Sequence, residues 1–350
     1  MERGRPIRRI HLLGGLTAFD NGSQSVYIGI GIERPLIQFP RPPYAEIYGH
    51  LIKINLPVVG AEFLDEQSIK RLRSPDWWCA SPRAGFRQKD EFRAWSAIRH
   101  AAQRDGRSDV ADAAARCSTY LDLLGIRLLE LSTAYNDMLR EWHAGRNEID
   151  ENLLHSSTFM RHIDAAIHAF LADAASLRDL TAAIVWRFIL GEQEQVTTLG
   201  TFLKKAKAHG EPLAIEICAA GQDGGWFKIL SGLRDQIVHV APMGSQQSDH
   251  SCRIKAVRCN EGVVVPALHY AISSPEGSVP PPELEIAETN EQALAALRRY
   301  AAFHKASIDG LDYCWRTVDR FVDVLSRVRA TAGFRQEVLG SGPIDLRGAI

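Results

Sequence analysis

The amino-acid sequence predicts a mainly α-helical protein: an antiparallel helical bundle with a β-rich N-terminal region and a β-hairpin insertion. Three observations predict this class. Long Ala- and Leu-rich stretches without proline fill the middle of the chain, and such stretches favour helices. Short β-branched runs broken by glycine and proline occupy the start. The 350 residues, 45% of them hydrophobic, suffice for a substantial core.

The composition narrows the class of protein further. The 41 basic and 42 acidic residues nearly cancel, so the whole molecule lacks the positive field of bulk nucleic-acid binders, and any RNA contact must be local. Six scattered cysteines are typical of reduced thiols. The basic N-terminus runs into too short an apolar segment for a signal sequence, and no apolar run is long enough to span a membrane. We therefore expect a soluble, cytoplasmic protein with no membrane contact.

Residues 1–85 form the predicted β-rich region, a candidate sensor. The runs VYIGIGIE and LIKINLPVVGAEFL are typical of strands and are separated by NGS and by the prolines of FPRPPY. The adjacent Trp77 and Trp78 then fall in a loop. An aromatic pair in such a place plugs an interface more often than it stacks on bases, and both interpretations stay open.

Residues 86–335 form the predicted bundle. Three helices are expected within residues 91–104, 112–142 and 157–190, and two shorter ones within 196–210 and 224–242. The last of these carries Trp226, Leu230, Leu233 and Ile237 on one stripe, and Pro242 ends it.

A β-hairpin insertion is expected at about residues 249–275, because alternating β-branched residues flank Asn260-Glu261-Gly262. The final helix opens with Thr289 and Gln292 at capping-box spacing and continues to about residue 330. Its apolar positions recur in steps of three and four, which predicts one helix packed along its whole length. Residues 336–350 form a tail.

The segment Arg234-Asp235-Gln236-Ile237-Val238-His239 is the most promising chemical motif. It pairs an arginine with a histidine near the end of an amphipathic helix. Other Arg/His pairs occur by chance at similar spacing, but their context is poorer. Two turns separate Arg161 from His168, and an apolar residue follows Arg93 before His100. The third alternative joins Arg298 or Arg299 to His304, which falls on the apolar seam and reads as a packed core histidine.

With its arginine, following polar residue and spaced histidine, this segment resembles the signature of HEPN ribonucleases. The resemblance covers residues 110–330, interrupted by the hairpin, and implies a HEPN-like bundle. It implies a metal-independent endoribonuclease that leaves 2′,3′-cyclic phosphate ends, with paired motifs facing across a homodimer. Members of the family often act as toxins or antiviral abortive-infection effectors, held in check by an antitoxin or sensor protein. Asparagine is more typical of the family at the position of Asp235.

The chemistry of the motif suits RNA cleavage. His239 can exchange protons near neutral pH, and Arg234 offers a planar fork of donors to a phosphate. On an ideal helix the two side chains lie about 140° apart, so a relaxed last turn or a second subunit must bring them together. Asp235, one turn before His239, is placed to orient the imidazole. The alternative is an ordinary solvated helix end, where the helix dipole favours a histidine.

A compact basic cluster close in sequence to the motif helix is formed by Lys204, Lys205, Lys207 and His209. They are candidate RNA-binding residues, and a solvated helix face explains them almost as well. No cofactor is expected, because no phosphate-binding or dinucleotide motif is present. No metal is expected either, because Cys252 and Cys259 lack further nearby ligands. The second hypothesis is a catalytically inactive HEPN-like scaffold or sensor that binds a nucleotide or a protein partner.

Overall fold

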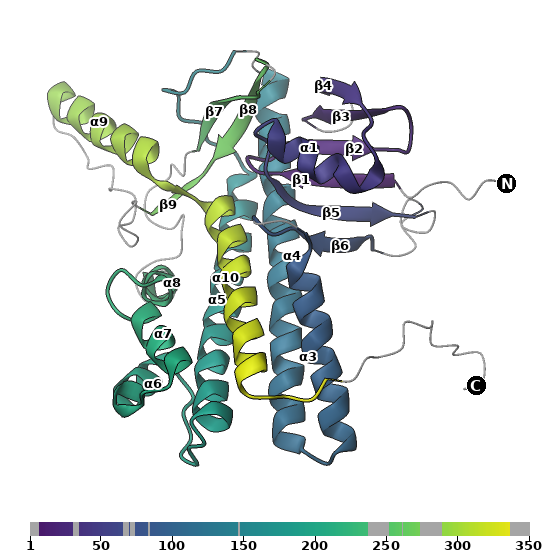
Figure 1. Ribbon diagram of the computed structural model, residues 1–350. Helices are drawn as coiled ribbons and strands as arrows, with labels where there is room; N and C mark the ends of the chain where they lie inside the picture. Colours follow the sequence, from purple (N-terminus) through teal and green to yellow (C-terminus); the bar gives the residue numbers. More distant parts are fainter. Residues whose placement is uncertain are drawn as a thin grey trace.

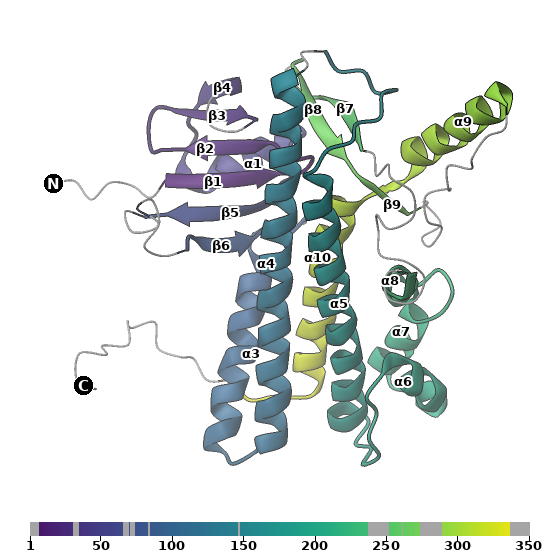
Figure 2. The ribbon, with the colours of Figure 1, turned by 180° about the vertical axis from the view of Figure 1, so that it is seen from behind.

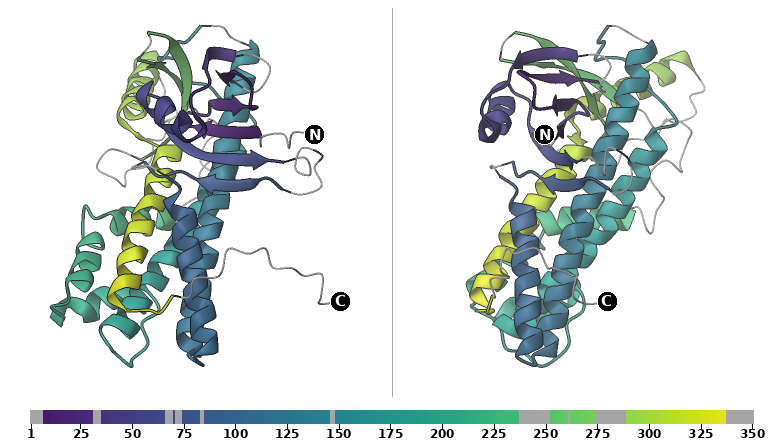
Figure 3. Two further views of the ribbon diagram at one scale, coloured as in Figure 1. Left: turned by 45° about the vertical axis from the view of Figure 1, so that its right-hand side comes forward. Right: turned by 90° about the vertical axis from the view of Figure 1, so that its right-hand side faces the viewer.

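The computed structural model describes residues 7–30, 35–65, 70, 74–82, 85–145, 148–236, 252–260, 262–273 and 289–336. It is mainly helical with a β-rich N-terminal region, as predicted (Figure 1). A six-stranded sheet lies at one end of a group of long helices, and three short helices flank the other end (Figure 3). The buried apolar side chains of the sheet and of the long helices form one continuous cluster.

The N-terminal sheet is antiparallel throughout, with the strand order β4-β3-β2-β1-β5-β6. Alternate residues of a strand face the core, as Val26 and Ile28 do on β3. The strands are β1 (Ile7–Leu12), β2 (Thr17–Asp20), β3 (Ser25–Gly29), β4 (Pro35–Pro40), β5 (Val58–Leu64) and β6 (Asp76–Cys79).

Two details of the predicted β-rich region were wrong. The first three residues of LIKINLPVVGAEFL lie in a helix, α1 (Ile47–Lys53). Ile47, Leu51 and Ile54 are spaced to line one face of that helix, and all three are buried. Trp77 and Trp78 lie on the edge strand β6 rather than in a loop.

The three long helices are confirmed as α3 (Arg87–Arg104), α4 (Ser108–Gly145) and α5 (Met160–Ile184), the last continuing as a π-helical turn over Val185–Ile189. Helix α4 runs the length of the molecule, with α3 and α5 antiparallel to it (Figure 2). Helix α10 (Gly310–Thr331) packs against all three. Within the described residues, none of the helices combines the length and apolarity needed to cross a membrane.

Three shorter helices flank the outer side of α5: α6 (Leu199–Lys205), α7 (Pro212–Ala220) and α8 (Trp226–Asp235). The sequence predicted α6 and α8 but missed α7. That helix begins with Pro212 and is capped by Glu211, which accepts a hydrogen bond from the Ala214 amide at 2.8 Å.

The predicted hairpin is confirmed as β7 (Arg253–Arg258) and β8 (Val264–His269), followed by β9 (Ala271–Ser273). The capping box of Thr289 and Gln292 is also confirmed. The prediction of a single final helix was wrong. The chain instead forms α9 (Asn290–Ala306), then β10 (Ile308–Asp309), which pairs with β9, and then α10. Asp309 caps α10 by accepting a hydrogen bond from the Asp312 amide at 3.0 Å.

Candidate functional site

Helix α8 carries the start of the predicted motif. Phe227, Leu230 and Leu233 are buried on one side of it, which confirms the amphipathic helix. The ring of Trp226 lies 5.1 Å from that of Phe321 on α10, edge to face. These contacts fix the angle at which α8 lies on the bundle. Ile237 and Pro242, the predicted end of the stripe and of the helix, lie outside the described residues.

Arg234 and Asp235 lie in the last turn of α8, at the helix end where the sequence predicts them. An Arg234 guanidinium nitrogen donates to the Asp235 carboxylate at 2.9 Å. The two side chains are 38% and 57% exposed, so this ion pair contributes little to stability. His239 lies outside the described residues, so its approach to Arg234 stays a prediction.

A chain of polar contacts ties the motif helix to α5 and α6. Arg178 on α5 donates to Ser231, which precedes Arg234 by one turn on α8. The same guanidinium donates to Asp179 at 3.0 Å. Asp179 in turn accepts a hydrogen bond from the Leu199 amide at 3.0 Å, at the start of α6. The face of α8 that precedes the motif is therefore anchored to the bundle.

Two members of the predicted basic cluster lie beside carboxylates, which offset part of its positive charge. Lys204 and Lys207 are exposed on and just after α6. Lys205 forms an ion pair with Glu194, and His209 lies 3.6 Å from Glu192. Lys204 and Lys207 therefore remain the better candidates for guiding an RNA backbone, and Lys205 is held by a carboxylate.

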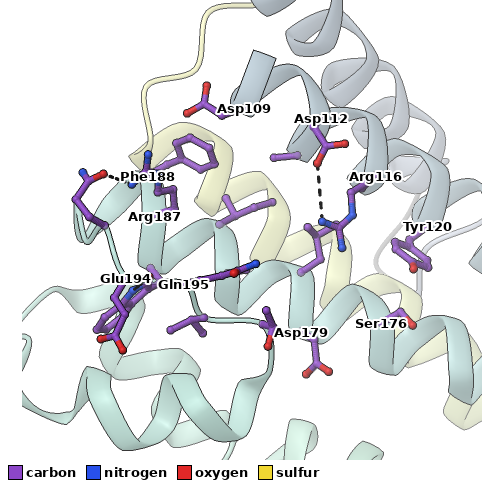
Figure 4. Close-up of a pocket in the computed structure, with 18 residues that line it drawn as sticks. Asp109, Asp112, Arg116, Tyr120, Ser176, Asp179, Arg187, Phe188, Glu194 and Gln195 are labelled. Carbon is purple, nitrogen blue, oxygen red and sulfur yellow. Dashed lines mark hydrogen bonds and ion pairs between the residues drawn. The ribbon is translucent and has the colours of Figure 1, made fainter. Parts of the chain in front are cut away.

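A cleft of about 560 Å³ lies between the start of α4 and the end of α5 (Figure 4). Asp112 and Arg116 face each other across 3.9 Å on its α4 side. Its carboxylates outnumber its arginines, because Asp109, Asp112, Asp179 and Glu194 line it against Arg116 and Arg187. Excess negative charge disfavours a polyanion such as RNA. Asp179 lines this cleft and also accepts the hydrogen bonds from Arg178 and from the Leu199 amide that connect α5 to α8 and α6.

Sequence reasoning missed a buried constellation between β1, β5 and α4. His11 Nδ1 lies 3.0 Å from Ser132 Oγ, and His11 Nε2 lies 3.0 Å from the Glu62 carboxylate. Burial raises the pKa of Glu62, but hydrogen bonds and charges from His11 and Arg9 outweigh it and lower that pKa overall. The residue types are those of a hydrolase relay. Ser132 is only 1% exposed, however, so a substrate has no access, and the constellation instead joins sheet to helix.

The competing Arg/His pairs occupy settings unlike that of the motif. His304 is 1% exposed, which confirms its interpretation as a packed histidine. Arg93 lies in the middle of α3, pairs with Asp90 at 3.9 Å and stacks on Trp78. Arg161 and His168 both lie within α5, away from its C-terminal end.

The aromatic pair on β6 packs within the protein. Trp77 meets the ring of His11 edge to face at 5.2 Å, and Trp78 lies 5.1 Å from Phe63. These contacts agree with the interpretation that the two rings fill an interface within the protein. Cys252 and Cys259 are both buried thiols. Among the residues that the structure describes, no three histidine, cysteine or acidic side chains gather as metal ligands.

No family model matches this chain, and comparisons with curated proteins and with solved structures return no match. Function is therefore argued from the chain's own residues.

Proposed function

We propose that the chain is a metal-independent HEPN endoribonuclease in which Arg234 and His239 cleave RNA to 2′,3′-cyclic phosphate ends. The observation that carries the proposal is the setting of the motif. Arg234 lies in the last turn of a short amphipathic helix packed on a helical bundle, with its side chain 38% exposed. A substrate phosphate can reach that guanidinium.

The proposed chemistry needs no group beyond the motif. In a homodimer, one His239 takes the proton of the 2′-hydroxyl as its oxygen bonds to phosphorus, and the His239 of the second subunit protonates the 5′-oxygen as the bond between phosphorus and that oxygen breaks. Arg234 stabilises the charge that develops on the phosphate. Two copies of the motif, one from each subunit of a homodimer, would supply the histidine and arginine that one straight helix would hold apart. As a toxin or antiviral effector, the protein would be released by an antitoxin, by a sensor protein or by a bound signal.

The test compares the wild-type protein with His239→Ala. Purified protein is incubated with total RNA in EDTA, and the 3′ ends of the products are identified by mass spectrometry. We expect cyclic phosphate ends from the wild type and at least a roughly hundredfold slower reaction from His239→Ala, which is typical of losing a general acid or base. The matched control is His100→Ala, which removes an exposed histidine from α3 and should cleave as the wild type does.

Expression in cells completes the test. Wild-type protein should stop growth and fragment cellular RNA, whereas His239→Ala should do neither. If wild type and His239→Ala leave total RNA equally intact in cells and in the purified reaction, the ribonuclease proposal fails.

A second candidate function is a catalytically inactive scaffold or sensor. The observation that favours it is α9, which extends away from the bundle in Figures 1 and 2. Leu294 and Leu297, one turn apart on this helix, are each 49% exposed, and exposed leucines at this spacing suit a protein partner. Under this candidate Leu297→Asp changes the mass of the assembly measured by light scattering, and His239→Ala changes nothing. An unchanged mass for Leu297→Asp contradicts it.

A further inference from the structure

Arg253, on the hairpin strand β7, is a buried cation. The residue is 6% exposed, and in the part of the chain that the structure describes its buried Nε has no hydrogen-bond partner. Among the described residues, no carboxylate forms an ion pair with its guanidinium. Proteins seldom bury a charge in this way, because the lost hydration is recovered only when an opposite charge or an acceptor takes its place.

Lys255 repeats the pattern two residues further along β7. It is half-buried, and the described part of the chain offers its ammonium group no ion pair. Alternate residues of a strand point to the same face, so both cations share one face of the hairpin. Burial lowers the pKa of Arg253 and also that of Lys255, as expected for cations that have lost water.

Two buried histidines border the same face. Arg253 is directly opposite His269 in the ladder of β7 and β8. Burial, followed by the charges of neighbouring basic side chains, lowers the pKa of His269 to about 3 and that of His304, on α9, to about 4. Both imidazoles are therefore neutral at pH 7, and they bring no charge that would balance or add to the two cations.

The nearby carboxylates are already engaged elsewhere. Asp309 accepts hydrogen bonds from the Tyr135 hydroxyl at 3.1 Å and from the Tyr270 amide at 2.9 Å, besides capping α10. Glu151 accepts a hydrogen bond from the Ala256 amide at 2.7 Å and acts on Arg253 only through its charge at a distance. Neither Asp309 nor Glu151 forms an ion pair with the Arg253 guanidinium, so the site retains its excess positive charge.

We propose that Arg253 and Lys255, on the hairpin face that adjoins His304 of α9, form a binding site for a small phosphate-bearing ligand. The planar guanidinium matches two phosphate oxygens, and the ammonium group supplies a second charge for a dianion. Because Arg253 is 6% exposed, an RNA strand or a protein surface cannot close around it, whereas a compact ligand can. The hairpin lies above α8 and separate from it in Figure 1, and this proposal does not depend on the proposed ribonuclease activity.

The site has a physical connection to the break between α9 and α10. His269 Nε2 lies 2.9 Å from Ser307 Oγ, and the Ser307 hydroxyl donates to the carbonyl of His304. The other nitrogen of His269 lies 3.6 Å from Asp309, the cap of α10. An anion beside Arg253 therefore lies next to the polar contacts at the break between α9 and α10.

The experiment measures the thermal midpoint of the full-length protein in a phosphate-free, low-salt buffer. Inorganic phosphate is then titrated against potassium chloride at matched ionic strength. We expect the midpoint to rise with phosphate and not with chloride, because a ligand that binds only the folded state stabilises it. Further arms contain a sugar phosphate and a nucleoside 5′-monophosphate. The arm that saturates at the lowest concentration identifies the natural source of the phosphate group.

Variants localise the effect. Arg253→Met keeps much of the side-chain volume and should abolish the phosphate response. The matched control Arg258→Met removes an exposed arginine from the end of the same strand and should respond as the wild type does. Lys255→Met should need roughly tenfold more phosphate, the cost of one charge-assisted contact. If Arg253→Met does not fold, the response of Lys255→Met still tests the proposal.

Three results would overturn the proposal. The first is a chloride response equal to that of phosphate, and the second is a full phosphate response in both Arg253→Met and Lys255→Met. The third is a clear loss of stability of Arg253→Met in phosphate-free buffer. Removing an uncompensated buried cation should leave that variant at least as stable as wild type, so such a loss would mean that the chain itself balances the charge of Arg253.

Discussion

His11 Nδ1 on β1 lies 3.0 Å from the Ser132 hydroxyl on α4, across the interface between the N-terminal sheet and the bundle. Both side chains are almost completely buried, at 3% and 1% exposure. The other ring nitrogen of His11 contacts Glu62, so neither nitrogen depends on water. This imidazole therefore joins two strands to a helix through buried polar contacts.

Ser132→Ala should destabilise the protein by about 1–3 kcal/mol, because it leaves a buried ring nitrogen without its hydroxyl partner. Urea unfolding at pH 7 measures the change. Ser118→Ala is the matched control, since Ser118 is also buried on α4 but its hydroxyl bonds only to the Ala115 carbonyl of its own helix. Equal costs for the two variants would show that the contact with His11 contributes nothing.

Gly15→Ala should be among the more damaging single changes in the sheet. Gly15 has φ +89°, and an added Cβ would lie 2.8 Å from the Tyr135 carbonyl oxygen, which belongs to the backbone of α4. We expect a loss of roughly 2–5 kcal/mol from left-handed strain and overlap together. Gly85→Ala separates the two effects. Gly85 has φ +73° with nothing within 4 Å, so it should lose only about 1–2 kcal/mol. Similar losses in urea unfolding would rule out the overlap with α4.

The parts of the fold that the sequence predicted correctly depend on local signals. Long runs without proline placed α4 and α5, and Thr289 with Gln292 placed the start of α9. The break between α9 and α10 has no such signal in the apolar seam, because two helices in register show the same spacing as one. The break depends instead on a distant segment, since the Gly310 amide donates to the carbonyl of Tyr270, between β8 and β9, at 2.9 Å.

The candidate sites divide in the same way. The position of Arg234 in the last turn of a helix followed from the local pattern of α8. His11, Glu62 and Ser132 lie far apart in the sequence, and only the packing of the sheet on α4 brings them together. The alternation around Arg253 predicted a hairpin but not that its charged face is buried, because burial depends on elements that come later in the chain.

Asp309→Asn should change how stability depends on pH. Burial raises the pKa of Asp309 to about 6 from the usual 3.8, although hydrogen bonds from the Asp312 and Tyr270 amides and from Tyr135 oppose it. The folded state therefore favours the protonated acid. This stabilisation is fully present below pH 3.8 and is lost as pH rises through 6, by up to about 3 kcal/mol.

Asparagine resembles the protonated acid at every pH, so the advantage of wild type over Asp309→Asn should shrink between pH 4 and pH 7. Urea unfolding at pH 4, 5.5 and 7 measures that difference. An advantage that stays constant or grows with pH would contradict the raised pKa of Asp309.

Asp235→Asn tests what the acid in the motif does. In the structure its carboxylate contacts Arg234 at 2.9 Å, so under the proposed function it competes with the substrate phosphate for the same guanidinium. We expect Asp235→Asn to speed RNA cleavage at limiting substrate through a lower KM. The gain should not exceed about fivefold, because an exposed pair is worth at most about 1 kcal/mol.

Asp223→Asn is the matched control for that measurement, since it removes the same charge from an exposed position in the turn before α8. A gain in both variants would trace the effect to net charge rather than to Arg234. Slower cleavage by Asp235→Asn would assign the carboxylate to His239, where orienting the imidazole supports proton transfer. The direction of the change in rate therefore shows whether Asp235 acts on Arg234 or on His239.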